Sequence, residues 1–119
     1  MVDWSERAPG ISIGVRTVGD IAIVDVRGVL PQRDYSLAAE VRQLLAMGHR
    51  RILVNLQDIR STGDYGVSNL VTSFVEITKA GGTLKLITDP YFDGVIKSVG
   101  MQTVFSAYPT EADALASPW

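Results

Sequence analysis

Apolar and polar residues alternate near the start of the chain with the spacing of a β-strand. Residues 11–16 alternate strictly, which is typical of a half-buried strand. After a turn at Gly19-Asp20, residues 21–26 are apolar on both faces for most of their length, as expected for a strand that is covered on both sides. The pattern therefore predicts an N-terminal hairpin whose second strand lies inside a sheet.

Beyond residue 35 the apolar positions take the spacing of amphipathic helices. One helix is predicted from about residue 35 to 47, with Gly48 at its C-terminal end, and a second from about 65 to 80, ending at Gly81-Gly82. The apolar stripe of the second helix is expected to pack in the core, and it consists of Val67, Leu70, Val71, Phe74 and Ile77.

Short apolar runs between these helices predict the remaining strands, at residues 52–56, 84–87 and 104–105. Asp89-Pro90 marks the start of a short helix, and Thr110 is the expected N-cap of a closing helix with an acidic first turn. Strands that are separated by helices generally lie parallel in one sheet.

The order of elements predicts one α/β domain over residues 1–119, with residues 1–10 as an N-terminal tail. The expected sheet is mixed but mostly parallel, with about four to five strands, an N-terminal hairpin and about four covering helices.

The amino-acid composition excludes several classes of function. The chain has 119 residues, of which 46% are hydrophobic, so a single core can form without disulfides or metal. There are no cysteines, which excludes thiolate chemistry and Cys-ligated metal. A net charge of −2 argues against a nucleic-acid partner. No apolar run has the length of a signal peptide or a membrane span, which predicts a cytoplasmic protein without membrane insertion.

Catalytic motifs are missing from the sequence. It contains no phosphate-binding glycine loop, no dinucleotide fingerprint and no zinc-protease motif, so we expect neither a metal nor a cofactor. The single histidine, His49, falls in a polar link before a strand, at the edge opposite the expected ligand crevice, and is interpreted as a solvated loop residue. Asp34 and Asp58 are interpreted as ordinary acidic loop residues.

Residues 61–67 stand out because they join the strand that ends near Leu56 to the second long helix. This turn lies at the carboxyl edge of the sheet, where ligands and partners usually dock. Asp64 is placed where the unsatisfied N–H groups of the helix favour negative charge. A role as N-cap explains an acid at this position, but it does not explain the surrounding Gly63, Tyr65 and Gly66.

Several short motifs, taken in order over residues 11 to 116, resemble the STAS domain of bacterial anti-sigma factor antagonists. The resemblance depends on their joint order and spacing. The motifs are Gly28-Val29-Leu30, Asn55-Leu56-Gln57-Asp58-Ile59, Gly66, Ala80-Gly81-Gly82 and Ile96-Lys97-Ser98-Val99-Gly100.

The resemblance implies a binding module and not an enzyme. Members of this family dock on an anti-sigma factor that is also a serine kinase, which frees the sigma factor, and phosphorylation ends the docking. Transferred by position, the expected partner-binding residues are Leu30, Gln32, Arg33, Gly63, Asp64, Tyr65, Gly66, Val67 and Ser68.

The chain departs from the family at the phosphorylated serine. The family's Asp-Ser-Ser/Thr-Gly quartet falls on residues 63–66, so Asp64 occupies the position of the acceptor serine. Since phosphoserine carries about −1.5 to −2 charges and a carboxylate carries one, Asp64 is a partial mimic of the phosphorylated state. Ser61, Thr62 and Ser68 are alternative acceptors, although Ser61 and Thr62 are also suited to turn and cap hydrogen bonds.

Other interpretations stay open at this point. The chain could be a STAS-like ligand-binding or scaffold subunit of a transport or signalling assembly, without phospho-regulation. Tyr65 is suited either to anchor a partner or to cover the core. Lys85 is expected to be solvated. Trp119 is either exposed or docked, and docking on a neighbouring chain would give a homodimer.

Overall fold

The computed structural model describes most of the chain. Its backbone is described at residues 5–8, 11–29, 36–61 and 64–119. Within those ranges, the side chains that lie outside the description are those of residues 5–8, 11, 29, 36, 60–61 and 64–69.

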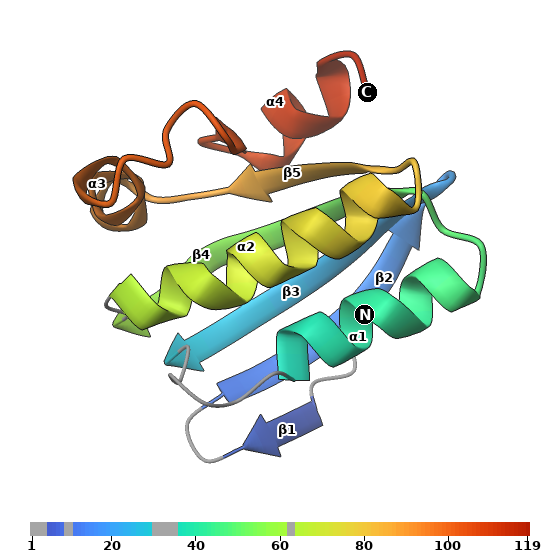
Figure 1. The fold of residues 1–119 in the computed structure, drawn as a ribbon, viewed down its shortest axis with the longest axis horizontal. Coiled ribbons are helices and arrows are strands. Elements are labelled where there is room, and N and C mark those ends of the chain that lie inside the picture. Colours follow the sequence, from blue (N-terminus) through green and yellow to red (C-terminus); the bar gives the residue numbers. More distant parts are fainter. Residues whose placement is uncertain (1–4, 9–10, 30–35, 62–63) are drawn as a thin grey trace.

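Within these ranges, six strands form one mixed sheet with four helices (Figure 1). The strands are β1 (Ser5–Ala8), β2 (Ile11–Val18), β3 (Ile21–Val29), β4 (Arg51–Ser61), β5 (Thr83–Ile87) and β6 (Ser106–Tyr108). The helices are α1 (Ser36–Ala46), α2 (Asp64–Lys79), α3 (Pro90–Ser98) and α4 (Glu111–Ala116).

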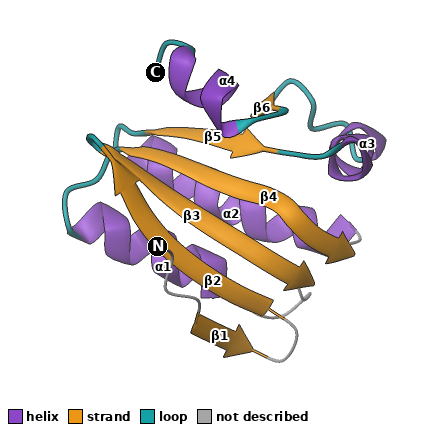
Figure 2. Ribbon diagram, turned by 180° about the vertical axis from the view of Figure 1, so that it is seen from behind, coloured by secondary structure: helices purple, strands orange, loops and turns teal. Residues whose placement is uncertain are grey.

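The strands follow one another across the sheet in chain order, from β1 at one edge to β6 at the other. The first three pair antiparallel, and β3 to β6 pair in parallel. Each connection between two parallel strands contains a helix. Each connection also leads to the neighbouring strand on the same side of the sheet. Because such crossovers are right-handed, these helices fall on one face of the sheet. Figures 1 and 2 show α1 and α2 lying along that shared face.

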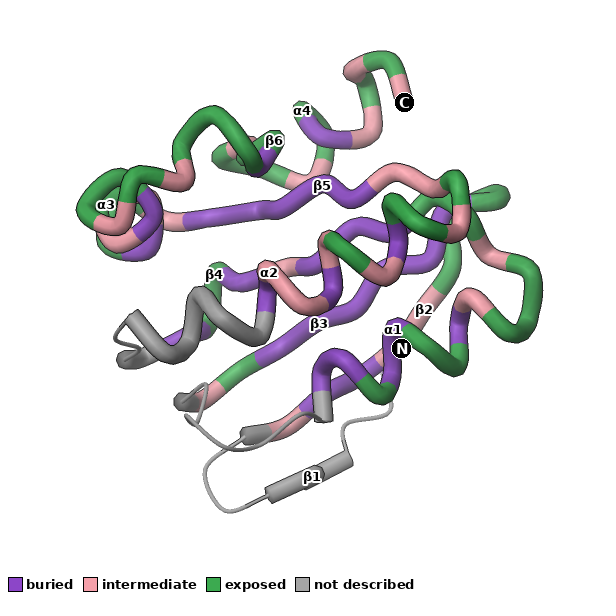
Figure 3. The backbone as a smooth tube through the Cα atoms, in the orientation of Figure 1, coloured by how far each residue is buried: buried purple, intermediate pink, exposed green. Residues whose placement is uncertain are grey.

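Alternate residues of the strands enter two separate hydrophobic cores. The larger core packs against α1, α2 and α3 and includes Ala22 and Val24 of β3. The smaller core lies on the opposite face and joins Ile21 and Ile23 of the same strand to Ala114 of α4. Figure 3 shows β3 and β4 buried through their middle. The prediction that the second hairpin strand lies inside the sheet is therefore confirmed.

The predicted mixed, mostly parallel sheet with its N-terminal hairpin is confirmed, and α1 and α2 begin and end within one residue of their expected bounds. Thr110 caps α4 as predicted, because its side chain accepts a hydrogen bond from the backbone N–H of Asp113. Residues 5–8 were expected in a tail, but they pair with β2 and give the sheet one strand more than predicted.

The predicted last strand at residues 104–105 is wrong, because β6 covers Ser106–Tyr108 instead. Phe105 is buried and packs edge-to-face on Phe74, with ring centroids 5.9 Å apart, so its apolar character reflects the core and not a strand. The strand itself is an edge strand with mostly exposed side chains, and it left no apolar pattern to detect.

Gly82 lies where the end of α2 approaches the start of β4. A Cβ at this position would lie 2.5 Å from the carbonyl oxygen of Arg50, and the backbone N–H of Thr83 donates to the same oxygen at 2.7 Å. The close approach of two backbone segments therefore requires a residue without a side chain.

We expect Gly82→Ala to lower the free energy of unfolding by about 1–3 kcal/mol, because the backbone has to move to accept the methyl group. Gly94→Ala is the matched control, since a Cβ there has no neighbour within 4 Å and Gly94 lies inside α3. The control should leave stability unchanged or raise it by up to about 1 kcal/mol. Urea denaturation measures the free energy of unfolding of both variants. Equal losses would contradict a close backbone approach at Gly82.

Among the helices of the described residues, none is long and apolar enough to cross a membrane.

Candidate functional site

The predicted docking edge lies where β3 and β4 continue past the last β4–β5 pair. That pair is Asn55 with Ile87. Beyond it, β4 stays beside β3 as far as the pair of Val29 with Ser61, and did not end near Leu56 as expected. The extended strand ends, residues 26–29 and 56–61, are called the ledge below, and Figure 2 shows them reaching beyond the end of β5.

Two strand ends that are distant in the sequence lie side by side at the ledge. The chain leaves β3 after Val29 toward the predicted contact loop, and it leaves β4 after Ser61 toward the turn that contains Asp64. Because Val29 and Ser61 are paired across the two strands, both predicted contact segments start from neighbouring strand ends. Sequence patterns predicted each segment separately, and the topology brings their starting points together.

The structure places only part of the predicted contact set. Leu30, Gln32, Arg33 and Gly63 lie outside the described residues, as do Asp34 and the alternative acceptor Thr62. The backbone places Ser61 at the end of β4. The predicted residues that lie at the start of α2 are Asp64, Tyr65, Gly66, Val67 and Ser68. The side-chain roles expected of these residues stay predictions.

Asp64 is the first residue of α2, which confirms where the second long helix was expected to begin. The N–H groups of a first helical turn have no partner within the helix and carry partial positive charge. A carboxylate there stabilises a helix by about 0.3–1 kcal/mol. Asp58, expected in a loop, lies instead on the exposed part of the ledge, where it pairs in register with Arg27.

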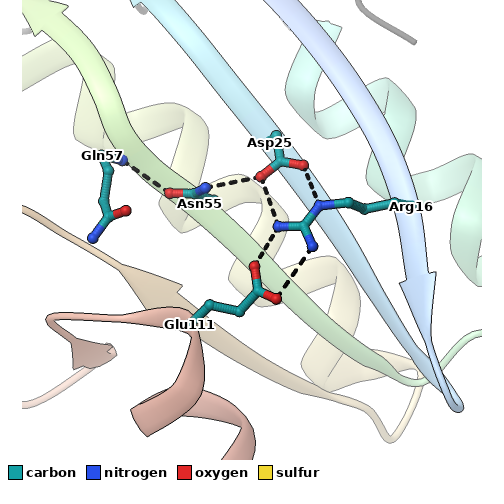
Figure 4. Close-up of polar contacts among 5 residues, drawn as sticks. All are labelled: Arg16, Asp25, Asn55, Gln57 and Glu111. Carbon is teal, nitrogen blue, oxygen red and sulfur yellow. Dashed lines mark hydrogen bonds and ion pairs between the residues drawn. The ribbon is translucent and has the colours of Figure 1, made fainter. Parts of the chain in front are cut away.

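A charged network on the far face of the sheet was not predicted from the sequence (Figure 4). Arg16 on β2 holds the carboxylate of Asp25 with two hydrogen bonds, from Nε at 2.7 Å and from Nη2 at 3.2 Å. The same guanidinium also donates to both carboxylate oxygens of Glu111 on α4. Asn55 completes the network by donating from Nδ2 to Asp25 at 2.8 Å.

The environment of this network keeps Arg16 charged. Asp25 is only 4% exposed, so its carboxylate depends on these donors instead of water. Hydrogen bonds with Glu111, and then with Asp25, raise the pKa of Arg16 above its ordinary value. Arg16 is therefore a permanent cation that joins the hairpin to α4.

The network also reaches the ledge through Gln57. The backbone N–H of Gln57 donates to Oδ1 of Asn55 at 3.1 Å, and its side-chain Nε2 donates to the carbonyl of Pro109 at 2.7 Å. Pro109 directly precedes the N-cap of α4. The end of β4 is thus linked to the segment that leads into the last helix.

The prediction that Lys85 is solvated is wrong, because this residue is only 2% exposed. Its Nζ donates to the carbonyl oxygens of Ala114 at 2.9 Å and Ser117 at 3.0 Å. The ammonium group also lies 4.2 Å from the ring centroid of Trp119 and 4.9 Å from that of Tyr108. Trp119 therefore docks on its own chain, which was one of the two arrangements left open.

One sequence signal could have identified both buried groups. Asp25 falls within the apolar run 21–26, and Lys85 stands between Leu84 and Leu86. A single charged residue inside an apolar strand is expensive to bury unless a partner is available. Such positions therefore indicate a buried pairing partner elsewhere in the chain.

His49 lies in the link before β4, at the opposite end of the parallel strands from the ledge, as predicted. A shallow pocket there includes Asp20, Arg50 and Arg51. The side chain of Arg50 donates hydrogen bonds to the backbone carbonyls of Leu45 and His49. Among the described residues, no group of three or more His, Cys, Asp or Glu could hold a metal ion.

A second shallow pocket lies at the carboxyl ends of β5 and β6, between Thr88 and Pro109. Asp89 at its edge accepts from the backbone N–H of Phe92, so it serves as the cap of α3. Among the described parallel strands, the order across the sheet never reverses. The sheet therefore lacks the switch point at which open α/β sheets form a deep crevice for small ligands.

Comparisons with known proteins agree with this architecture. No protein-family model matches the chain, and no curated protein matches its sequence. Solved structures do match: an anti-sigma factor antagonist from Mycobacterium paratuberculosis superposes with a TM-score of 0.78 at 22% identity, covering 91% of this chain and 94% of that one. The chain therefore has the STAS fold of the anti-sigma factor antagonists.

SpoIIAA of Bacillus, an anti-sigma factor antagonist and cell fate determinant, matches in two states. Its unphosphorylated form gives a TM-score of 0.70 at 17% identity, covering 87% of this chain and 92% of that one. Its phosphorylated form gives 0.64 at 17% identity, covering 87% and 96%. The fold is thus compatible with both states of that protein.

Proposed function

We propose that this chain is a protein-binding regulator of the antagonist type, which docks on an anti-sigma factor that is also a serine-protein kinase. In this proposal the chain takes part in partner switching and acts by occupying a surface, without catalysis. The docking surface consists of the ledge and the first turns of α2, and the contact residues expected from the sequence at positions 30–33 lie outside the described residues.

The pairing of Val29 with Ser61 is the observation that supports this proposal most directly. It brings the starts of both predicted contact segments to one end of the sheet. A protein partner that contacts both segments at once needs a broad surface of this kind, whereas a small ligand needs an enclosing pocket. The sequential order of the strands favours a protein partner, because it provides no deep crevice for a small ligand.

The proposal assigns the regulation to a fixed charge. Asp64 begins α2, and the sequence resemblance aligns it with the serine that members of the family phosphorylate. A carboxylate cannot be removed by a phosphatase, so dephosphorylation does not take this negative charge from the docking surface. The chain would then behave permanently like a partly phosphorylated antagonist, with weakened docking.

The direct test is a calorimetric titration with the anti-sigma kinases of the source organism. We expect Asp64→Ser to bind about tenfold more tightly than the wild type, which corresponds to about 1.4 kcal/mol. Asp20→Ser is the matched control, because it removes an equal charge from an exposed side chain at the opposite end of the sheet, outside the proposed docking surface. Unchanged affinity of Asp64→Ser, or an equal gain in both variants, would contradict the role of Asp64.

Phosphorylation is tested separately by incubation with the kinase and ATP, followed by intact-mass analysis. We expect no phosphate on residues 61–68 of the wild type and one phosphate on Asp64→Ser. Stoichiometric phosphate on the wild type at Ser61, Thr62 or Ser68 would show that the switch has moved to a neighbouring hydroxyl, and it would overturn the fixed-charge proposal.

A further inference from the structure

Helix α4 is attached to the sheet by a small apolar core and by charged and polar contacts at its two ends. It covers Glu111–Ala116, which is too short to be stable as a helix in isolation. Only Ala114 within it is fully buried, with Leu115 and Trp119 packing nearby. Its position therefore depends on the groups that hold its two ends.

A cation from the sheet holds each end with the polarity that a helix favours. Arg16 of β2 pairs with Glu111 in the first turn, where a negative side chain is favourable. Lys85 of β5 donates to the carbonyls of Ala114 and Ser117 at the other end, where carbonyl oxygens lack partners within the helix. The two cations come from strands that flank β3 and β4.

The contacts of α4 are separate from those of the other helices. The small core beneath it shares no residue with the large core under α1, α2 and α3. Its loss would remove Glu111 from Arg16, but it would leave Arg16 paired with Asp25. The rest of the sheet thus keeps its main packing and its buried ion pair when α4 leaves.

We propose that residues 109–119 form a clasp, fastened by Arg16 and Lys85, that opens as one unit while the remaining fold stays intact. Opening uncovers the apolar patch of Ile21, Ile23, Leu53 and Ile87 on the far face of the sheet. The clasp is also tied to the ledge, because Gln57 binds the carbonyl of Pro109. This inference does not depend on the identity of the docking partner.

Native-state hydrogen exchange tests the clasp residue by residue. We expect the helical amides of α4 in the wild type to exchange at least tenfold faster than those of β4, because they open without global unfolding. Glu111→Gln should speed exchange in α4 by about a further tenfold and leave β4 unchanged. Slow α4 exchange at the rate of β4, or equal acceleration of both, would overturn the proposal.

Glu76→Gln is the matched control, since Glu76 pairs with Arg42 at 3.6 Å between α2 and α1 and the change removes the same charge. It should leave α4 exchange as in the wild type, and acceleration of α4 in this variant would count against a specific fastening. A second variant, Lys85→Met, keeps an aliphatic side chain and removes the ammonium group. Because the clasp opens as one unit, we expect faster exchange of the helical amides of α4 with β4 unchanged, and unchanged exchange in α4 would exclude Lys85 as a fastener.

Discussion

The Asp25→Ala variant is expected to lose about 3 kcal/mol of its free energy of unfolding. Asp25 is nearly fully buried and accepts hydrogen bonds from Arg16 and Asn55. Removing the carboxylate leaves the guanidinium with Glu111 alone and leaves the Asn55 amide without its acceptor. The loss of one partner from a buried charged network costs more than the network contributes in total, because the remaining groups stay desolvated.

Asp20→Ala provides the matched control for this variant. Asp20 pairs with Arg51 at 3.2 Å, but its side chain is 72% exposed. Water screens such a pair, so its removal should cost less than about 1 kcal/mol. Urea denaturation of both variants measures the difference, and similar losses for Asp25 and Asp20 would show that the network does not stabilise the fold.

A second large loss is expected for Phe92→Ala, which should lower the free energy of unfolding by about 3–5 kcal/mol. Phe92 is 0% exposed and packs in the larger core. Its truncation leaves a cavity at the contact between α3 and the sheet, and the surrounding side chains can refill it only in part.

Tyr91→Ala is the control for this variant, because Tyr91 is the preceding residue of α3 and is 50% exposed. We expect it to cost less than about 1 kcal/mol. If both truncations destabilised the chain equally, the orientation of α3 would be wrong. Of this aromatic pair, Phe92 is buried in the core and Tyr91 is half exposed at the surface.

Sequence patterns predicted the elements that pack against the large core. The stripe of α2 could be recognised because Leu70 and Ile77 recur at helical spacing, and both are buried. The strand β6 could not be recognised, because an edge strand of three exposed or half-buried residues has no apolar period. β1 likewise lies at an edge, where pairing depends on the backbone of β2 instead of its own side chains.

For the candidate site, too, the sequence predicted the local features but not the contacts between distant segments. The turn before α2 was identified by its glycines and by Asp64, because local residue types reveal a helix start. The pairing of Val29 with Ser61 depends on the register between two strands that are separated by a helix, and sequence spacing does not specify it. Arg16 and Glu111 are still further apart in the chain, and no local pattern connects them.

The hairpin of β2 and β3 has a consequence for how the chain folds. Its strands meet across a turn at Gly19 and Asp20, whereas β4 joins β3 only after α1 has been passed. Closing a short turn costs less chain entropy than closing a long connection, and isolated hairpins form within about 1–10 μs. We therefore expect the hairpin to be made first, as a template on which later strands add in order while the chain emerges from the ribosome.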